Sequence, residues 1–461
     1  MPRIPNNYTR RQFLQRTAAT AGALAAANAI ALPDHRLEAA SFPTNVPPSD
    51  RLRFGIIGVG MEGSGVLSNA VALPGGECVA AADLYDERHL LAREITGKPN
   101  LFTTRKYKEL LDNKDIDCIL AAVPDHWHKQ VVVDSVRAGK PIYCEKPMSH
   151  TAADGVEMVA AAKETGKIVQ IGSQRVSSVI CAKAREILAQ GTIGTLTLVE
   201  GTYGRNDPNG AWEYPTPPGL SPQNFDWETW QGTVPKRAWD PDMSPKYFAR
   251  WRCWREYGTG VAGDLLVHLV SGMMFMLGIN EQPNRVQALG NIIRWKDGRN
   301  MPDVHAALYE YPSLQAPVYL RLNLGGASPE TYRFYGSKGT LEVTEYDIKY
   351  SPQTGENDSP SYYTGSFPNA MRAAYAKQWH EENDPKPGKE PTLEGFTYTG
   401  ASWDELKPHL WNFFQAVRTN GTVTEDAVFG HHAALACHMA NESYFRHAPT
   451  TWDAATNTIK S

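Results

Sequence analysis

The stretch Leu52-Arg53-Phe54-Gly55-Ile56-Ile57-Gly58-Val59-Gly60-Met61-Glu62-Gly63 decides the fold. Its first half is a short apolar run that meets glycine at once, which is typical of a buried parallel strand entering a tight turn. Its second half is a G-x-G-x-x-G pattern. Gly58 permits the turn, Gly60 lets the backbone approach a pyrophosphate, and Gly63 lets helix and strand pack closely. The pattern predicts a dinucleotide-binding unit, with Met61 at the N-terminus of a helix that faces the anion.

Strand and helix patterns then alternate along the chain. Strands are expected at 78–82, 116–123, 141–144 and 168–171, and helices at 84–96, 128–138 and 152–165. This order predicts an N-terminal Rossmann domain, a doubly wound parallel sheet over residues 51–174.

The pattern changes after this domain. A helix at 176–190 is followed by strand-like runs at 196–203, 304–311, 318–324, 331–335 and 340–343, and two helices are expected at 403–418 and 425–447. The runs alternate like an antiparallel sheet with one wet face. We therefore expect a C-terminal α+β domain over residues 175–445, with a large open mostly antiparallel sheet, followed by a tail at 446–461.

The first 32 residues have the layout of a twin-arginine export signal. Thr9-Arg10-Arg11-Gln12-Phe13-Leu14 precedes an alanine-rich apolar stretch, and a linker at 33–50 follows. The alternative is a short membrane anchor, but the stretch is weakly hydrophobic and shorter than the ~20 residues that a spanning helix needs. The expectation is export in the folded state to the periplasm or beyond, without stable membrane insertion.

Composition excludes several classes of protein. A net charge of -4 without long runs of Lys or Arg gives no sign of a basic surface that would bind nucleic acid. Six dispersed cysteines without a C-x-x-C pair indicate neither a zinc site nor a disulfide framework. His431, His432 and His438 invite a metal interpretation, but they fall on an apolar helix, so we expect packing there and no metal.

Asp83 follows the second strand, about 20 residues after the glycine turn. A carboxylate there suits a ribose with a free 2′-hydroxyl and would repel a 2′-phosphate, which favours NAD over NADP. NADP remains the alternative, because Arg88 is close in sequence and a bent loop would let it accept a phosphate. The alternative role of Asp83 is to cap the helix expected from Leu84 onward, without contact to a cofactor.

Five motifs in this order resemble the Gfo/Idh/MocA oxidoreductases. They are Val123-Pro124-Asp125-His126-Trp127-His128, Cys144-Glu145-Lys146-Pro147, Gly172-Ser173-Gln174-Arg175, Phe225-Asp226-Trp227-Glu228-Thr229-Trp230-Gln231-Gly232 and Tyr335-Gly336-Ser337-Lys338-Gly339-Thr340. The resemblance runs from about Arg51 to about Tyr444, and it is closest to the secreted branch of the family, whose members carry a leader.

The resemblance implies that Lys146 is the general acid/base on the reacting hydroxyl. It also implies that Asp264 aligns the substrate and that His268 shares the proton relay. The i, i+4 spacing places Asp264 and His268 on one helix face, where the carboxylate can orient the imidazole. The purely structural alternatives are that Lys146 extends from a sheet edge into solvent and that Asp264 and His268 form a salt bridge within a helix. Ser271 stands where the family often has an acidic residue.

Further residues are predicted to contact the cofactor or the substrate. Pro124 and His128 should line the nicotinamide ribose, and Glu145 and Gln174 should face the cofactor. The substrate residues are predicted to be Arg175, Tyr203, Trp251 and Arg252, with Arg255 as a second candidate clamp. The aromatic residues between 206 and 257 form either a sugar-stacking wall or, more commonly for such residues, core.

These residues together predict an NAD(P)-dependent oxidoreductase that acts on a hydroxyl of a sugar or polyol. An exported enzyme meets no free nicotinamide pool, so we expect the cofactor to be bound tightly and regenerated in the same site. The alternative is a redox-neutral glycosidase or lyase that uses transient oxidation and elimination, although such relatives commonly replace the lysine. A cofactor-bound sensor without turnover is a third hypothesis. A homodimer or homotetramer is expected from the open sheet.

Overall fold

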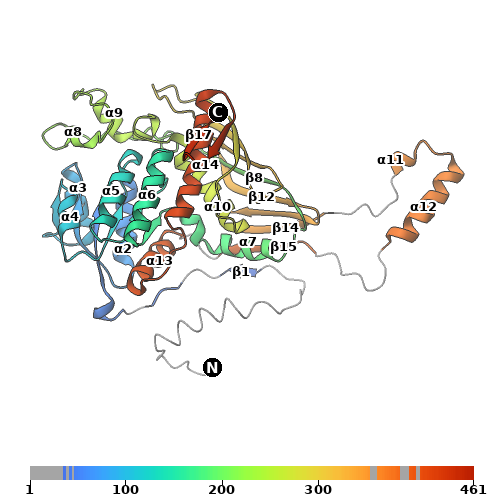
Figure 1. Ribbon diagram of the computed structural model, residues 1–461, viewed down its shortest axis with the longest axis horizontal. Helices are drawn as coiled ribbons and strands as arrows, with labels where there is room; N and C mark the ends of the chain where they lie inside the picture. Colours follow the sequence, from blue (N-terminus) through green and yellow to red (C-terminus); the bar gives the residue numbers. More distant parts are fainter. Residues whose placement is uncertain are drawn as a thin grey trace.

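The computed structural model describes residues 35–37, 41–43, 46–353, 361–384, 394–400 and 405–460. These residues form a Rossmann domain and a second domain built on a large sheet, which lie side by side (Figure 1). The leader predicted at 1–32 lies outside the described residues. No helix in the described ranges is long and apolar enough to cross a membrane.

The N-terminal domain holds a six-stranded parallel sheet in the order β4-β3-β2-β5-β6-β7. Its strands are β2 (Leu52–Ile57), β3 (Gly76–Ala82), β4 (Phe102–Thr104), β5 (Cys118–Ala121), β6 (Ile142–Cys144) and β7 (Val169–Ile171). Its helices are α2 (Met61–Ala72), α3 (Glu87–Thr96), α4 (Lys108–Asp112), α5 (Asp125–Arg137) and α6 (Ala152–Thr165), after a short 3₁₀ turn η1 (Pro48–Asp50). The predicted doubly wound sheet is confirmed. β4 was not predicted, because three residues at a sheet edge carry too little pattern.

The glycine turn has the backbone that the motif requires. Gly58 has a φ of 86°, and a Cβ there would lie 2.4 Å from the carbonyl oxygen of Ala122. A Cβ at Gly63 would lie 2.1 Å from the carbonyl oxygen of Gly58. The first glycine is therefore needed for the turn, and the third for contact between α2 and β2.

The second domain is built on an eleven-stranded sheet in the order β1-β15-β14-β13-β12-β8-β11-β10-β9-β16-β17. Its strands are β1 (His35–Leu37), β8 (Leu196–Gly204), β9 (Arg285–Asn291), β10 (Val304–Glu310), β11 (Val318–Asn323), β12 (Ser328–Gly336), β13 (Gly339–Thr344), β14 (Asp347–Pro352), β15 (Phe396–Gly400), β16 (Thr450–Asp453) and β17 (Thr458–Lys460). Most neighbours are antiparallel, whereas β8 with β11 and β1 with β15 are parallel. The expected open mostly antiparallel sheet is confirmed.

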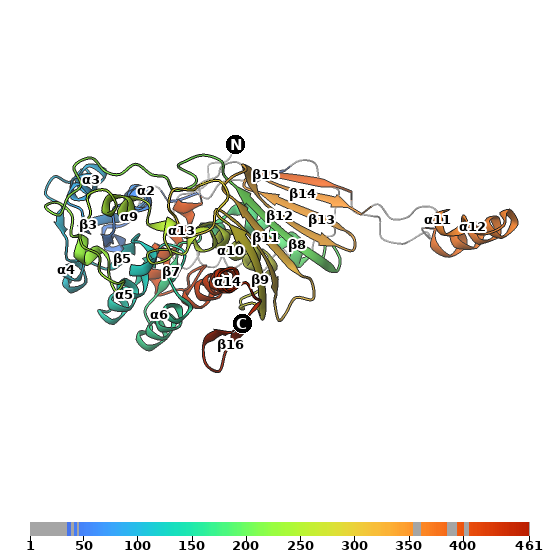
Figure 2. The ribbon, with the colours of Figure 1, turned by 90° about the horizontal axis from the view of Figure 1, so that it is seen from above.

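Helices cover one face of this sheet and leave the other open (Figure 2). The helical elements of the domain are η2 (Gln174–Ser177), α7 (Val179–Ala189), α8 (Trp227–Trp230), α9 (Ser244–Ala249), η3 (Trp251–Cys253), η4 (Ala262–Leu266), α10 (Val267–Leu277), α11 (Ser361–Thr364), α12 (Asn369–Asn383), α13 (Leu406–Thr419) and α14 (Ala427–Arg446). α13 packs on α2, and α14 packs on α6, so the C-terminal helices also join the two domains. α11 and α12 form an arm that projects from the sheet (Figure 1).

The segment at 446–461 is not a simple tail, which corrects the sequence prediction. β16 pairs with β9, and β16 and β17 form a hairpin at the sheet edge. In the predicted linker, β1 pairs with β15 at the opposite edge, in parallel. Such short strands gain their hydrogen bonds from an existing edge, so their own sequence pattern is weak.

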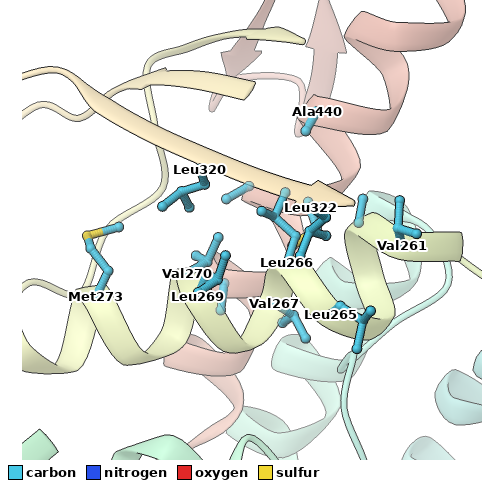
Figure 3. Packing of buried hydrophobic residues seen from close by; sticks show 14 of the residues in the cluster. Val261, Leu265, Leu266, Val267, Leu269, Val270, Met273, Leu320, Leu322 and Ala440 are labelled. Atoms are coloured by element: carbon cyan, nitrogen blue, oxygen red, sulfur yellow. The ribbon is translucent and has the colours of Figure 1, made fainter. Parts of the chain in front are cut away.

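η4 and α10 form the central helix of this domain, and η4 is a π-helical turn. Leu266, Leu269 and Val270 lie beside Leu320 and Leu322 of β11 (Figure 3). This packing fixes the helix against the sheet, and with it the side chains that the same helix presents to the Rossmann domain.

The close contact at Gly63 predicts a difference between two glycines of α2. Gly63→Ala should destabilise the protein by at least about 2 kcal/mol, because its methyl group overlaps the carbonyl of Gly58. Gly65→Ala should be neutral or stabilise by about 0.5–1 kcal/mol, because a Cβ there meets nothing within 4 Å. Thermal unfolding followed by circular dichroism measures both, and equal transition midpoints for the two variants would contradict the packing described.

Candidate active site

Two adjoining cavities lie at the carboxyl ends of the Rossmann strands, where open α/β sheets bind ligands. The first, the catalytic cleft, spans about 700 Å³ when the open solvent at its mouth is included. The second, the adenosine-side pocket, spans about 570 Å³ on the same measure. Both are lined by Arg88, Ala122, Val123, Pro124 and Trp230, so they form one continuous groove.

The start of α2 fits a pyrophosphate. No side chain caps the N-terminus of α2 at Gly60, so N–H groups of its first turn and the positive end of its dipole are available to an anion. Arg88 lies beside the turn, 3.3 Å from where a Cβ of Gly60 would stand. Gly58 lines the adenosine-side pocket, whereas Gly60 and Met61 line the catalytic cleft.

Asp83 is buried at the end of β3 and lines the adenosine-side pocket. Its carboxylate accepts hydrogen bonds from the backbone N–H groups of Val59 and Tyr85, at 2.8 and 3.0 Å, and Arg88 lies at 3.4 Å. The side chain thus joins the glycine turn to the end of β3 instead of capping α3, which begins at Glu87. An ionised carboxylate has about four acceptor sites, so it retains capacity for a ribose hydroxyl.

Lys146 and Asp264 meet across the two domains. The Lys146 ammonium donates to the Asp264 backbone carbonyl at 2.8 Å and to its Oδ1 at 3.0 Å. Lys146 lines the catalytic cleft, and both side chains are close to nine-tenths buried. The predicted juxtaposition of lysine and carboxylate is therefore present.

Two further side chains hold the Asp264 carboxylate. Arg252 Nε donates to Oδ1 at 2.7 Å, and the Trp212 indole N–H donates to Oδ2 at 3.1 Å. Burial alone would raise the pKa of Asp264, but Arg252, Lys146 and Arg205 outweigh it and hold that pKa far below its usual range. Asp264 is thus a permanent anion.

His268 lies one turn further along the same helix, yet no hydrogen bond joins it to Asp264 among the described residues. Its Nδ1 is buried without a partner in that part of the chain. Burial, followed by the positive charges of Lys146 and Arg175, lowers the pKa of His268 well below its usual value. The carboxylate accepts from Lys146, Arg252 and Trp212 but not from the imidazole, so the contacts do not support the expectation that Asp264 orients His268. The ring is neutral and retains a nitrogen for another partner.

Glu145 lies beside Lys146 and lines the catalytic cleft. Its carboxyl accepts from the Tyr143 hydroxyl at 2.9 Å and from the Lys146 backbone N–H at 3.2 Å. Burial, and then the negative charge of Glu62, raise the pKa of Glu145 to about 8. At neutral pH this carboxyl is therefore mostly protonated.

Seven predicted residues line neither cavity: Gly63, His128, Gln174, Arg175, Tyr203, Asp264 and His268. Asp264 adjoins the catalytic cleft through its contacts with Lys146 and Arg252, which do line it. His128 is buried, with Nδ1 2.7 Å from the carbonyl oxygen of Pro147 and Nε2 2.8 Å from that of Val123, so it braces the loop that carries Lys146 instead of facing a ribose. Gln174 contacts Glu145 at 3.5 Å, behind the cleft. Gly63 packs inside the turn. Tyr203 accepts a hydrogen bond from Arg205 Nε at 3.1 Å.

Arg175 also lies outside the two cavities. Its guanidinium donates to Glu330 at 2.8 and 2.7 Å and also pairs with Glu405. The Tyr332 hydroxyl lies 2.8 Å from Glu330 and 3.0 Å from the backbone carbonyl of His268. The arginine predicted to touch substrate thus belongs to a buried ionic network that supports the helix of His268.

The aromatic stretch is mainly core. Trp212, Trp227, Trp230, Trp254 and Tyr257 are buried, whereas Tyr214, Trp239, Tyr247 and Trp251 are partly buried. Tyr214, Trp230 and Trp251 line the catalytic cleft beside Arg252. Of the two candidate clamps, Arg252 therefore faces the cleft, whereas Arg255 pairs with Glu442 elsewhere.

Sequence reasoning missed the roles of Trp212 and Arg205 around Asp264. Trp212 has a φ of 63°, rare for a bulky residue, and its indole holds Asp264. Arg205 stacks on Tyr203 at 5.1 Å and contributes to the lowered pKa of Asp264. Nothing in the spacing of Trp212 and Arg205 indicates that either acts on Asp264, because these residues are far from Asp264 along the chain.

The three histidines considered for a metal lie on α14. His438 Nε2 is 3.1 Å from the Ser149 hydroxyl, and His432 Nδ1 is 2.8 Å from the Asn280 amide oxygen. Within the part of the chain that the structure describes, no group of three or more His, Cys, Asp or Glu side chains could hold a metal ion.

The raised pKa of Glu145 predicts how stability depends on pH. In the unfolded chain the carboxyl ionises near its usual 4.5, whereas in the folded protein it stays protonated up to about 8. The free energy of unfolding of the wild type, relative to that of Glu145→Gln, should therefore fall as pH rises from about 4.5 to about 8 and then level off. Denaturant unfolding of both proteins across this range measures the difference. The exposed Glu157→Gln is the control, and a pH-independent difference for Glu145→Gln would refute a raised pKa.

Two family models match the chain. A model described as the oxidoreductase family, NAD-binding Rossmann fold, of Gfo/Idh/MocA matches residues 52–173, and the GFO/IDH/MocA C-terminal domain model matches residues 233–342. Together they account for both sides of the catalytic cleft.

Similar proteins include curated enzymes and solved structures. Inositol 2-dehydrogenase of Salmonella paratyphi B is 32% identical over 157 residues, 33% of this chain and 46% of that enzyme. 1,5-anhydro-D-fructose reductase of Ensifer adhaerens is 24% identical over 240 residues, 52% of this chain and 60% of that enzyme. The chain thus matches about half the length of these relatives.

A solved levoglucosan dehydrogenase, in complex with NADH and levoglucosan, superimposes with a TM-score of 0.61 at 17% identity, covering 87% of this chain and 99% of that chain. This likeness shows a shared two-domain fold. Because the family's Rossmann-domain model and its C-terminal-domain model both match, in this order along the chain, the chain belongs to the Gfo/Idh/MocA family of oxidoreductases.

Proposed function

We propose that this protein is an NAD-dependent oxidoreductase that acts on a CH–OH group of a sugar or polyol. One observation carries the proposal: the Lys146 ammonium, held by the buried anion Asp264, lines the same cleft as the glycine turn. The names of the relatives, an inositol dehydrogenase and an anhydrofructose reductase, support a polyhydroxylated substrate.

The residues of the groove fit NAD. The uncapped N-terminus of α2 and Arg88 would hold the pyrophosphate, and Asp83 would accept from the adenosine ribose. Bound NAD would supply the acceptor for a hydride. Two backbone N–H groups hold the buried carboxylate of Asp83 in place. A 2′-phosphate would bring a second anion beside this carboxylate, so NAD is favoured over its 2′-phosphorylated form.

The proton is handled by the chain's own residues. Lys146 lies where its neutral amine would take the proton from the reacting hydroxyl on oxidation and become the ammonium, and where the ammonium would return that proton on reduction. Asp264 fixes the lysine and remains charged throughout, because its pKa is held far below neutrality. His268, kept neutral by burial, has a ring nitrogen that would contact a neighbouring hydroxyl and share the proton relay.

The cofactor is proposed to stay bound through turnover. Thr229 and Trp230 line the adenosine-side pocket, and Phe248 and Trp251 line the catalytic cleft, all from the segment between 206 and 257. This segment is fastened to the Rossmann domain by a β-bridge between Tyr85 and Phe225 and by Arg88 stacked on Phe248 at 4.5 Å. Such a cover would retain a dinucleotide, as an exported enzyme requires.

Replacement of the lysine tests the mechanism. Lys146→Ala should retain the nucleotide of the purified protein but reduce it with sugars at least about 100-fold more slowly, because the proton acceptor is lost. Nicotinamide absorbance on addition of monosaccharides gives the rate, and denaturation followed by chromatography identifies the nucleotide.

Lys129→Ala is the matched control, because this lysine lies on α5 and pairs with Asp154 outside the groove. An unchanged rate in Lys146→Ala would remove Lys146 from the mechanism. Release of a leaving group from an aryl glycoside without net change in absorbance would instead favour the redox-neutral glycosidase.

Export by the twin-arginine route is the second part of the proposal. Replacing Arg10 and Arg11 together by lysine should abolish export, because the paired arginines are the element read by that route. Fractionation of cells into cytoplasm and periplasm measures it, with Arg3→Lys as the control. Continued export of the double variant would argue for another route or for an anchor.

A further inference from the structure

Arg252 has unused hydrogen-bonding capacity beside Lys146. Its Nε donates to Asp264 Oδ1 at 2.7 Å, and its guanidinium stacks on the Trp251 ring at 4.1 Å. Within the described residues, no hydrogen bond engages its two terminal nitrogens. The side chain is 16% exposed and lines the catalytic cleft, so these nitrogens are fixed in orientation and open to a ligand.

The charge around this point is unbalanced. Lys146 and Arg252 contact the carboxylate of Asp264, and Arg205 acts on it through its charge. The buried carboxylate of Asp125 also acts on Arg252, so three cations face two carboxylates and an excess of positive charge remains. The acidic side chains that line the cleft are Glu145 and Glu62. Glu145 is mostly protonated, and Glu62 is exposed at the mouth, where solvent screens its charge. A substrate that carries an anionic group would restore the balance.

The cofactor does not require this arginine. Arg88 and the N-terminus of α2 already face the position of the pyrophosphate, and Arg88 lines both cavities. Arg252 lines only the catalytic cleft. Lys146 and Arg252 approach the same oxygen of Asp264, so the two cations stand within the width of one sugar ring.

We propose that the substrate is an acidic sugar or polyol, whose carboxylate is bound by the terminal nitrogens of Arg252 while one of its hydroxyls meets Lys146. A stacked, planar guanidinium presents two parallel donors that match a carboxylate, and a site built around such a pair rejects the uncharged analogue. This inference rests on the proposed oxidoreductase function, whose substrate class it specifies.

The test compares each hexuronate with the neutral hexose of the same configuration, using the protein with its own cofactor. Both the binding of the sugar and the reduction of the nucleotide are measured. The wild type should prefer the acid in kcat/KM by at least about 30-fold, and Arg252→Gln should abolish that preference while keeping its nucleotide. Arg252→Lys should restore only part of it, because a lysine keeps the charge but lacks the paired donors.

Arg237→Gln is the matched control, since Arg237 also stacks on an aromatic ring and pairs with a carboxylate, but outside the catalytic cleft. It should keep the full preference. The acid-to-neutral ratio is the decisive quantity, because the loss of the Nε contact to Asp264 lowers the rates on both sugars alike.

The outcomes separate the two proposals. Equal turnover of acid and neutral sugar, a preference for hexose phosphates, or loss of nucleotide in Arg252→Gln would overturn the inference and leave the oxidoreductase intact. Binding of hexuronates that depends on Arg252, without reduction of the nucleotide, would support the inference and overturn the oxidoreductase. The absence of both binding and reduction for every sugar would overturn both.

Discussion

The site depends on one buried carboxylate. Asp264 receives donors from Lys146, which follows β6, and from Trp212 and Arg252, which both lie in the aromatic stretch between 206 and 257. An isolated buried carboxylate would be costly, and removing one partner of such a group is usually more damaging than its net contribution suggests. The carboxylate therefore sets the relative positions of the lysine, the arginine and the helix of the second domain.

Each domain contributes what the other lacks. The Rossmann domain offers the glycine turn, Asp83 and Lys146, but its strand ends alone would be open to solvent. The second domain supplies Asp264, His268 and the aromatic cover, and the π-helical turn η4 places Asp264 at the junction. Helices α13 and α14 pack back on α2 and α6 of the Rossmann domain, so two further contacts outside the cleft hold the domains together.

The sequence predicted the structure best where the backbone leaves no room for a side chain. The glycine turn leaves no room for side chains at Gly58 and Gly63, so its conformation could be predicted from those residues alone. The alternation of strands and helices likewise predicted both domains, and the family resemblance implied that Lys146 and Asp264 serve the same site. What remained hidden was long-range: the indole of Trp212 on Asp264, the ionic network of Arg175, and the edge strands β1, β16 and β17. His128 and Arg175 were assigned to ligands because a polar side chain near a strand end looks the same in sequence whether it faces a cavity or a buried carbonyl.

The six cysteines have a practical consequence. Every thiol is buried and free, on strands and helices of both domains. A thiol-specific reagent would therefore react only when the structure opens locally, so its rate of modification would map the stability of the region around each cysteine. A single cysteine introduced on the surface, on the projecting arm for example, would be the sole fast-reacting label in the folded protein.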